Sequence, residues 1–168
     1  MEERAATGVA VATVEAQTAP GLPGYGHPSF KGTFHLKLDA TGRVALPAAL
    51  KGAFGAQCVL RPHRNEYLNL WTPLGFDEFL KAFVASRPVG VVGPRTRKRL
   101  HMSATESAVD KQSRFVIPPD LRAQAGLGER IVLAGSIETI EIWPAETFEA
   151  EEATFDEADL FLDAFEGL

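Results

Sequence analysis

The sequence predicts an α+β, β-rich fold built from two copies of one small unit with flanking helices. Three observations predict it: an internal repeat, strand-like alternation of apolar and polar residues in each copy, and helical spacing of apolar residues after the first copy. The repeat carries the most weight. Asp39–Pro47 (DATGRVALP) matches Asp110–Pro118 (DKQSRFVIP) at an offset of 71 residues, and Leu70–Trp71 matches Ile142–Trp143 at an offset of 72. The small drift indicates that loop lengths differ between the copies.

The first copy begins with a strand, because apolar Phe34, Leu36 and Leu38 alternate with polar neighbours. Asp39–Gly42 has the residue types of a tight turn, and Pro47 suits the first position of a short helix. A longer helix starts at Pro73, where Phe76, Phe79, Leu80 and Phe83 form one apolar stripe. The other elements expected in this copy are the strands 43–46, 57–61 and 67–71, the last two joined by a polar turn around 62–65.

The second copy predicts the same order of elements. Its strands are expected at 104–109, 115–117, 131–134 and 139–143, with a short helix at 119–126 and a further helix from Pro144. Pro94–Met102 predicts a basic helix between the copies. Each unit has only about 45 residues before its flanking helix, too few to sustain a core alone. The copies must therefore pack on each other or on other chains, and pairing or strand exchange would close their open strand edges.

Charge is distributed unevenly along the chain. The formal net charge is −5, yet residues 30–122 hold 15 Lys/Arg and 7 Asp/Glu, which gives +8. Residues 145–168 hold nine acids and no base. The basic middle can attract an anion such as nucleic acid, because binding depends on the local field. An ordinary solvated surface followed by an acidic tail accounts for the same pattern, and charge alone does not decide between the two.

Residues 1–28 are rich in Ala, Thr, Gly and Pro, so we expect a flexible arm there, although a misassigned start codon would leave the same pattern. Neither a signal peptide nor a membrane span is recognisable, and the single cysteine, Cys58, fits a reducing compartment. We therefore expect a cytoplasmic protein. The sequence has no Cys or His pairs at metal-ligand spacing, no phosphate-binding glycine loop and no nucleophile elbow. We therefore expect that the protein is not an enzyme and binds no cofactor or metal.

The turn after the first strand of each copy holds the residues with the clearest chemistry. Asp39 and Asp110 can each accept hydrogen bonds from a turn, leaving Arg43 and Arg114 at the start of the next strand. An arginine fork can bind a phosphate or a guanine edge through two hydrogen bonds. Alternatively, each Asp–Arg pair is a salt bridge that only stabilises its turn. A single copy favours that alternative, whereas duplication with a nearby lysine, Lys37 or Lys111, favours DNA contact.

With its paired turn motifs, the sequence resembles the MraZ family, whose members have two SpoVT-AbrB-type domains. The similarity runs from about Pro28 to Phe148. The residues that carry it are Phe30–Thr33, Leu38–Pro47, Leu70–Pro73, the basic run Arg95–Arg99, Ala104–Glu106, Val109–Pro119, Leu121–Arg122, Ala125–Leu127 and Ile142–Trp143.

The resemblance implies two tandem, pseudo-symmetric AbrB-like units of the swapped-hairpin or double-split β-barrel type. It also implies a ring-shaped homo-oligomer that binds short direct repeats in double-stranded promoter DNA, represses the division and cell-wall gene cluster including its own gene, and associates with the nucleoid. Its expected DNA contacts are Arg43 and Arg114, to which we add Lys37, Lys111, Thr41 and Gln112. The expected turn-forming residues are Asp39, Gly42, Asp110 and Ser113. Ser113 departs from the family's glycine; if that position has positive φ, serine is strained and the second turn can differ in shape.

These expectations divide the chain into a flexible arm (1–28), a first SpoVT-AbrB-type repeat (29–76), a helical linker (77–103), a second repeat (104–148) and an acidic helical tail (149–168), where Phe161, Ala164, Phe165 and Leu168 have helical spacing. The main alternative is an antitoxin-like or scaffold protein that binds a partner protein through the fold and the tail. The basic run at Arg95–Arg99 has three interpretations: phosphate contact, a solvated face, or ion pairing with the acidic tail of another subunit.

Overall fold

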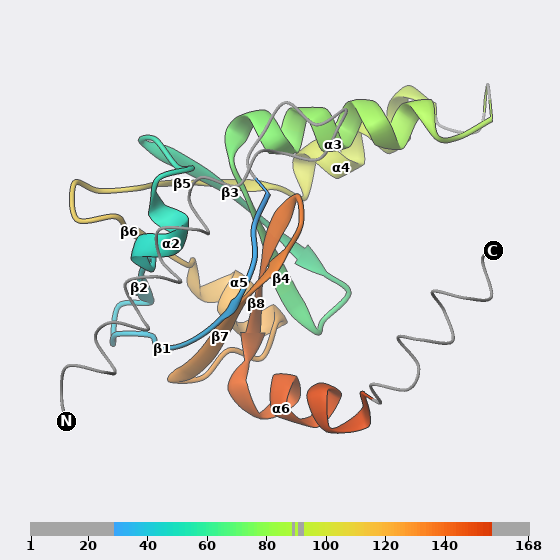
Figure 1. Ribbon diagram of the computed structural model, residues 1–168. Coiled ribbons are helices and arrows are strands. Elements are labelled where there is room, and N and C mark those ends of the chain that lie inside the picture. Colours follow the sequence, from blue (N-terminus) through green and yellow to red (C-terminus); the bar gives the residue numbers. More distant parts are fainter. Residues whose placement is uncertain (1–28, 89, 91–92, 156–168) are drawn as a thin grey trace, which may run out of the picture.

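The computed structural model describes residues 29–88, 90 and 93–155 of the chain. The predicted α+β, β-rich class is confirmed, with eight strands and five helices within these ranges (Figure 1). The predicted arm and the apolar spacing in the tail lie outside them. The elements are β1 (Thr33–Lys37), β2 (Arg43–Ala45), α2 (Ala48–Lys51), β3 (Gln57–His63), β4 (Tyr67–Trp71), α3 (Pro73–Ala85), α4 (Pro94–Met102), β5 (Thr105–Ala108), β6 (Arg114–Val116), α5 (Pro119–Gln124), β7 (Arg130–Ser136), β8 (Thr139–Pro144) and α6 (Ala145–Thr154).

The strands of the two halves interleave in one antiparallel sheet. Its order is β1-β7-β8-β4-β3-β5, and β2 pairs with β6 in a separate two-stranded ribbon. Strand β1 of the first half pairs with β7 of the second, and β5 of the second half pairs with β3 of the first. Strands β4 and β8 pair with each other in the middle. Each half therefore gives its first strand to the other half, and β1 and β5 form the two edges of the sheet.

The core is shared between the halves and uses equivalent positions of the repeat. Val44 and Phe115 pair across the ribbon and are both buried, as are Leu50 and its counterpart Leu121. These side chains belong to one continuous apolar cluster with residues of the central strands, such as Leu70. Neither half encloses this cluster alone, so folding of one half depends on burial by the other.

Helix α3 covers one end of the sheet through a second, smaller apolar cluster. Its N-terminus is capped by Thr72, whose hydroxyl oxygen accepts a hydrogen bond from the N–H of Gly75 (2.9 Å), and Pro73 occupies the first helical position. Phe76 and Phe79 pack against Trp71 with ring-centroid distances of 6.1 and 4.7 Å. The apolar stripe of the helix therefore faces the sheet, as its spacing predicts.

Helices α3 and α6 lie at opposite ends of the sheet (Figure 1). The cause is the antiparallel pairing of β4 with β8, because the two strands finish at opposite ends of the sheet and each is followed directly by its helix. Helix α4 has the predicted bounds and no buried residue. No helix in the described ranges is long and apolar enough to span a bilayer.

One predicted turn is shorter than expected. Strand β3 continues to His63, and Pro62 pairs with Leu68, so the connection to β4 is only Arg64–Glu66. Proline is tolerated there because β5 pairs with β3 only as far as Leu60, which leaves the end of β3 without a neighbour on that side. The sequence does not show where β5 stops, and that limit decides whether Pro62 fits a strand.

A close backbone crossing at Gly135 gives a test of the fold. A Cβ atom there would lie 2.5 Å from the backbone nitrogen of Lys31, where the N–H of Gly135 donates to the carbonyl of Gly32 (2.8 Å). We expect Gly135→Ala to lower the free energy of unfolding by about 1–3 kcal/mol, because the overlap forces the two segments apart. Urea denaturation would measure the loss. The control is Gly128→Ala, since no atom lies within 4 Å of a Cβ there; equal losses in both variants would contradict the crossing.

Candidate nucleic-acid interface

The β2–β6 ribbon places Arg43 and Arg114 on one outward face. In its antiparallel register Arg43 lies opposite Val116 and Arg114 lies opposite Ala45, while Val44 and Phe115 face the core. Because side chains alternate along a strand, both arginines point away from the core on the same side. Diagonal neighbours in such a ladder are about 7–8 Å apart. The ribbon is short and is anchored from below by two buried apolar residues.

The first turn is organised around the carboxylate of Asp39. Its Oδ1 accepts hydrogen bonds from the N–H of Thr41 (2.9 Å), from the Thr41 hydroxyl (2.7 Å) and from the N–H of Arg43 (2.9 Å). The hydrogen bond from the Thr41 side chain, followed by that from the Arg43 backbone, holds the pKa of Asp39 below its usual value. The carboxylate therefore stays ionised and fixes the start of β2.

The second turn repeats this arrangement. Oδ1 of Asp110 accepts hydrogen bonds from the N–H of Gln112 (2.8 Å) and of Arg114 (2.9 Å). The backbone hydrogen bond from Arg114 is the largest cause of the lowered pKa of Asp110. The N–H of Ser113 donates to the carbonyl of Asp110 at 3.0 Å, and the N–H of Gly42 donates to the carbonyl of Asp39 at the same distance. The two turns have the same hydrogen-bond framework despite their different sequences.

Each aspartate also pairs with the guanidinium group of its own turn. Nε of Arg43 lies 3.6 Å from Oδ2 of Asp39, and Nε of Arg114 donates to Oδ2 of Asp110 at 3.0 Å. The arginine side chains are 39% and 36% exposed. Within the described ranges no hydrogen bond is made by the terminal Nη groups of either arginine. Asp110 thus occupies the inner N–H of Arg114, and Asp39 lies beside that of Arg43 without a hydrogen bond to it. The outer end of each fork is left open to a ligand, so a turn salt bridge and an external contact are compatible.

The four other predicted contact residues are exposed but are not placed alike. Thr41 and Gln112 occupy equivalent positions in the two turns. Lys37 lies at the end of β1, paired with Arg130, whereas Lys111 lies within the second turn. The lysines are therefore not copies of each other in the repeat, and the shared face of the ribbon is defined by the two arginines.

Gly42 and Ser113 both have positive φ, at 81° and 59°. A Cβ atom at Gly42 would lie 2.8 Å from Cζ and Nε of Arg122 and 2.9 Å from the carbonyl oxygen of Ile117. Arg122 thus packs against the first turn, and sequence reasoning missed this role. One sequence feature could have indicated this role. The two copies differ at this position, since Arg122 in the second half corresponds to an exposed lysine, Lys51, in the first.

The described residues contain no group of three or more His, Cys, Asp or Glu that could hold a metal ion.

Trp71, which stands at a strand end, is buried in the cluster below α3 rather than exposed as a stacking platform. Trp143 is half-buried and stacks on Tyr67 with 4.4 Å between ring centroids.

Comparison with known proteins identifies relatives over most of the chain. A family described as "MraZ protein, putative antitoxin-like" matches residues 100–166. The chain is 31% identical over 140 residues to the Transcriptional regulator MraZ of Leuconostoc citreum, covering 83% of this chain and 96% of that protein. It is 33% identical to the protein of the same name from Corynebacterium kroppenstedtii, covering 77% and 90%. The Thermomicrobium roseum protein of that name is also 33% identical, covering 73% and 86%. These relatives are named as regulators of transcription, not as enzymes.

The contact between Gly42 and Arg122 predicts unequal tolerance in the two turns. We expect Gly42→Ser to lower the free energy of unfolding by about 1–3 kcal/mol, because the added side chain overlaps Arg122 and Ile117 at a positive φ. Ser113→Gly should change it by less than about 1 kcal/mol, since relief of strain offsets the added freedom of the unfolded chain. Thermal or urea unfolding measures both. Equal effects at the two positions would show that Arg122 does not constrain the first turn.

Proposed function

Because the chain belongs to the MraZ family, we propose that it is a sequence-specific DNA-binding regulator of transcription that reads promoter DNA through Arg43 and Arg114. We further propose that its two halves, 29–76 and 104–148, are AbrB-type swapped-hairpin units joined by the linker 77–103. Its target would be the division and cell-wall gene cluster with its own gene, bound as short direct repeats by a homo-oligomeric ring.

One observation carries the proposal: the side chains of Arg43 and Arg114 share one face of a short ribbon. Arg43 and Arg114 start paired strands whose buried residues, Val44 and Phe115, fix the ribbon to the core. Each guanidinium group is also oriented by a carboxylate of its own turn. A pair of oriented forks suits repeated contacts along a duplex, either to phosphates or to the O6 and N7 acceptors of guanine.

Oligomerisation would supply the affinity that one ribbon lacks. A good bidentate arginine contributes roughly 1–3 kcal/mol of base discrimination. Several ribbons held in one ring gain effective concentration, since the first contact brings the others to neighbouring sites. The charge of +8 over residues 30–122 supports a further, sequence-independent attraction to phosphates that weakens as salt rises.

A second candidate follows from the words "antitoxin-like" in the matched family's description. In that case the same fold and the acidic C-terminal residues would bind a partner protein. The two candidates differ in one measurable respect, because only the first needs the outward face of the ribbon. A co-purifying partner protein together with no DNA binding would favour the second.

The arginines give the direct test of this proposal. We expect Arg43→Ala, and likewise Arg114→Ala, to abolish the electrophoretic shift of DNA from upstream of the chain's own gene, because every subunit loses a contact. The salt dependence of any residual binding should also decrease, since fewer phosphates are neutralised.

Arg87→Ala is a matched control, because Arg87 is an exposed arginine that lies over the ring of Phe83 beside α3, away from the ribbon. It should leave the shift unchanged. Size-exclusion chromatography of each variant shows whether the oligomer persists. A normal shift by the doubly substituted, correctly folded protein would overturn the assignment of the ribbon.

A further inference from the structure

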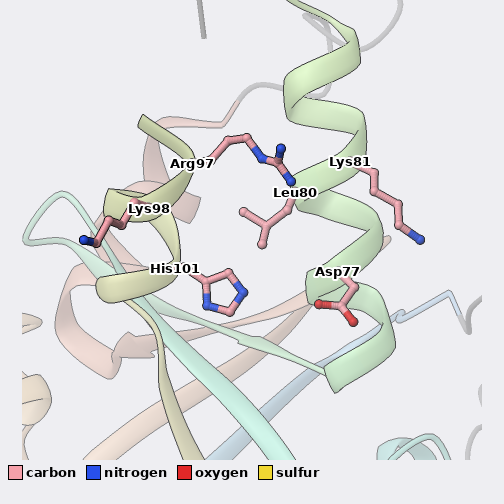
Figure 2. Close-up of a pocket in the computed structure, with 6 residues that line it drawn as sticks. All are labelled: Asp77, Leu80, Lys81, Arg97, Lys98 and His101. Carbon is pink, nitrogen blue, oxygen red and sulfur yellow. The ribbon is translucent and has the colours of Figure 1, made fainter. Parts of the chain in front are cut away.

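The groove between α3 and α4 has the composition of a docking site. It encloses a cavity of about 470 Å³ lined by Asp77, Leu80, Lys81, Arg97, Lys98 and His101. Figure 2 shows Leu80, Arg97 and His101 reaching into the space between the helices, with Lys98 and Lys81 on its outer sides. A second cavity of about 290 Å³ adjoins the first, because Asp77 and His101 line both.

The floor of this groove is apolar. Val59, Phe76 and Ala104 line the second cavity, and Leu80 lines the first. Val59 and Phe76 are buried members of the small cluster around Trp71. A floor of this kind accepts apolar side chains of a bound peptide, as in the grooves that bind amphipathic helices.

The rim of the groove is basic. Helix α4 carries Arg95, Arg97, Lys98 and Arg99, all of them exposed, and has no acidic residue in its first turn. Within the described ranges none of these four forms a salt bridge. The two cavities are lined by two acids, Asp77 and Glu106, against three cations, Lys81, Arg97 and Lys98. The net field at the rim is therefore positive and suits an acidic occupant.

The chain itself contains a segment of matching chemistry at its C-terminus. Residues 156–168 hold five acids and no base, whereas the N-terminal residues 1–28 hold three acids and one base. Phe161, Ala164, Phe165 and Leu168 are spaced at i, i+3, i+4 and i+7. That spacing would direct apolar side chains to one side and acids to the other if the segment binds as a helix. The apolar side matches the floor, and the acids match α4.

The arrangement of the helices favours a neighbouring copy as the source of the segment. Residues 156–168 follow α6, and α6 lies at the end of the sheet opposite α3 and α4 (Figure 1). Two copies arranged head to tail would bring this segment of one copy to the α3–α4 end of the next. A contact of this heterologous type repeats from copy to copy and closes into a ring when the rotation allows.

We propose that residues 156–168 of one copy dock in the α3–α4 groove of the next copy, with Phe161 and Phe165 on its apolar floor and the acids against α4. This inference rests on the proposed homo-oligomer. It adds which surfaces link neighbouring subunits and that the contact runs head to tail. It does not depend on DNA binding.

Disulfide trapping tests the contact directly in the full-length chain. The only native cysteine, Cys58, gives no background, because it is fully buried and burial raises the pKa of its thiol to about 12. We expect His101→Cys combined with Phe165→Cys to form, on mild oxidation, covalently linked dimers and longer chains on non-reducing gels. Lys51→Cys combined with Phe165→Cys is the control, because Lys51 is exposed on α2, outside the groove. This variant should form no covalent link on the same gels.

The other outcomes of trapping are decisive as well. A link formed within one chain would overturn docking between copies. Absence of any link in the His101–Phe165 pair, with the groove accessible to a thiol reagent, would overturn docking altogether. Efficient linking of His101→Cys to Val11→Cys instead would assign the groove to the N-terminal segment.

Charge reversal provides a test that misfolding cannot imitate. We expect Arg97→Glu with Lys98→Glu to weaken self-association at least tenfold in sedimentation experiments, and Asp159→Lys with Asp163→Lys in the same chain to restore it. Failure of the second pair to rescue the first would contradict the ion pairing. Neither assay contains DNA, so a negative result would leave the proposed reading of DNA by Arg43 intact. Conversely, normal trapping in a protein that does not bind DNA would contradict only the proposed reading of DNA.

Discussion

Burial of Val44 against Phe115 across the β2–β6 ribbon joins the two halves of the molecule and orients its candidate binding face. These side chains are 0% and 1% exposed and belong to the core shared by both halves. Burying each contributes about 1.5–3 kcal/mol. Because residues alternate along short strands, the same burial forces Arg43 and Arg114 outward on one side. The stability of the core and the geometry of the surface therefore have one cause.

The repeat is symmetric in its hydrogen bonds but not in its surroundings. Both turns place an aspartate oxygen on two backbone N–H groups, and both have positive φ at the residue before the arginine. Only the first is packed against a half-buried arginine, Arg122. Glycine is required where that contact leaves no space for a side chain, and serine is accommodated in the other turn. The two arginines are thus held by similar turns with different support.

Local elements of the fold could be predicted from the sequence, because periodicity and turn residues are local signals. The bounds of β4 and α4 agree with the prediction, and α3 begins at the predicted Pro73. The pairing of β1 with β7 could not be derived from the residues, since any alternating strand can pair with several others and the partners lie about a hundred positions apart. Resemblance to a family implied such an exchange; the residues alone implied only that open edges must be closed.

The same distinction holds for the candidate site. The sequence indicates both aspartates and both arginines, because the motif occurs twice, and the register of β2 with β6 then decides that the arginines share a face. Arg122 was missed because its contact with Gly42 spans 80 positions and depends on where α5 packs. The end of β3 was misjudged for a related reason, since it depends on the length of a neighbouring strand from the other half.

Strand exchange also has a consequence for synthesis of the chain on the ribosome. Strand β1 is the first strand to be synthesised, but its partner β7 is the last but one. Strand β3 likewise lacks its neighbour β5 on one side until the second half is synthesised. Contacts so distant in sequence slow folding, because loop closure must precede the gain from pairing. Until β7 has left the exit tunnel, the nascent first half has exposed edges and an incomplete core. The paired arginine face likewise cannot form before β6 of the second half has emerged, because β6 pairs with β2.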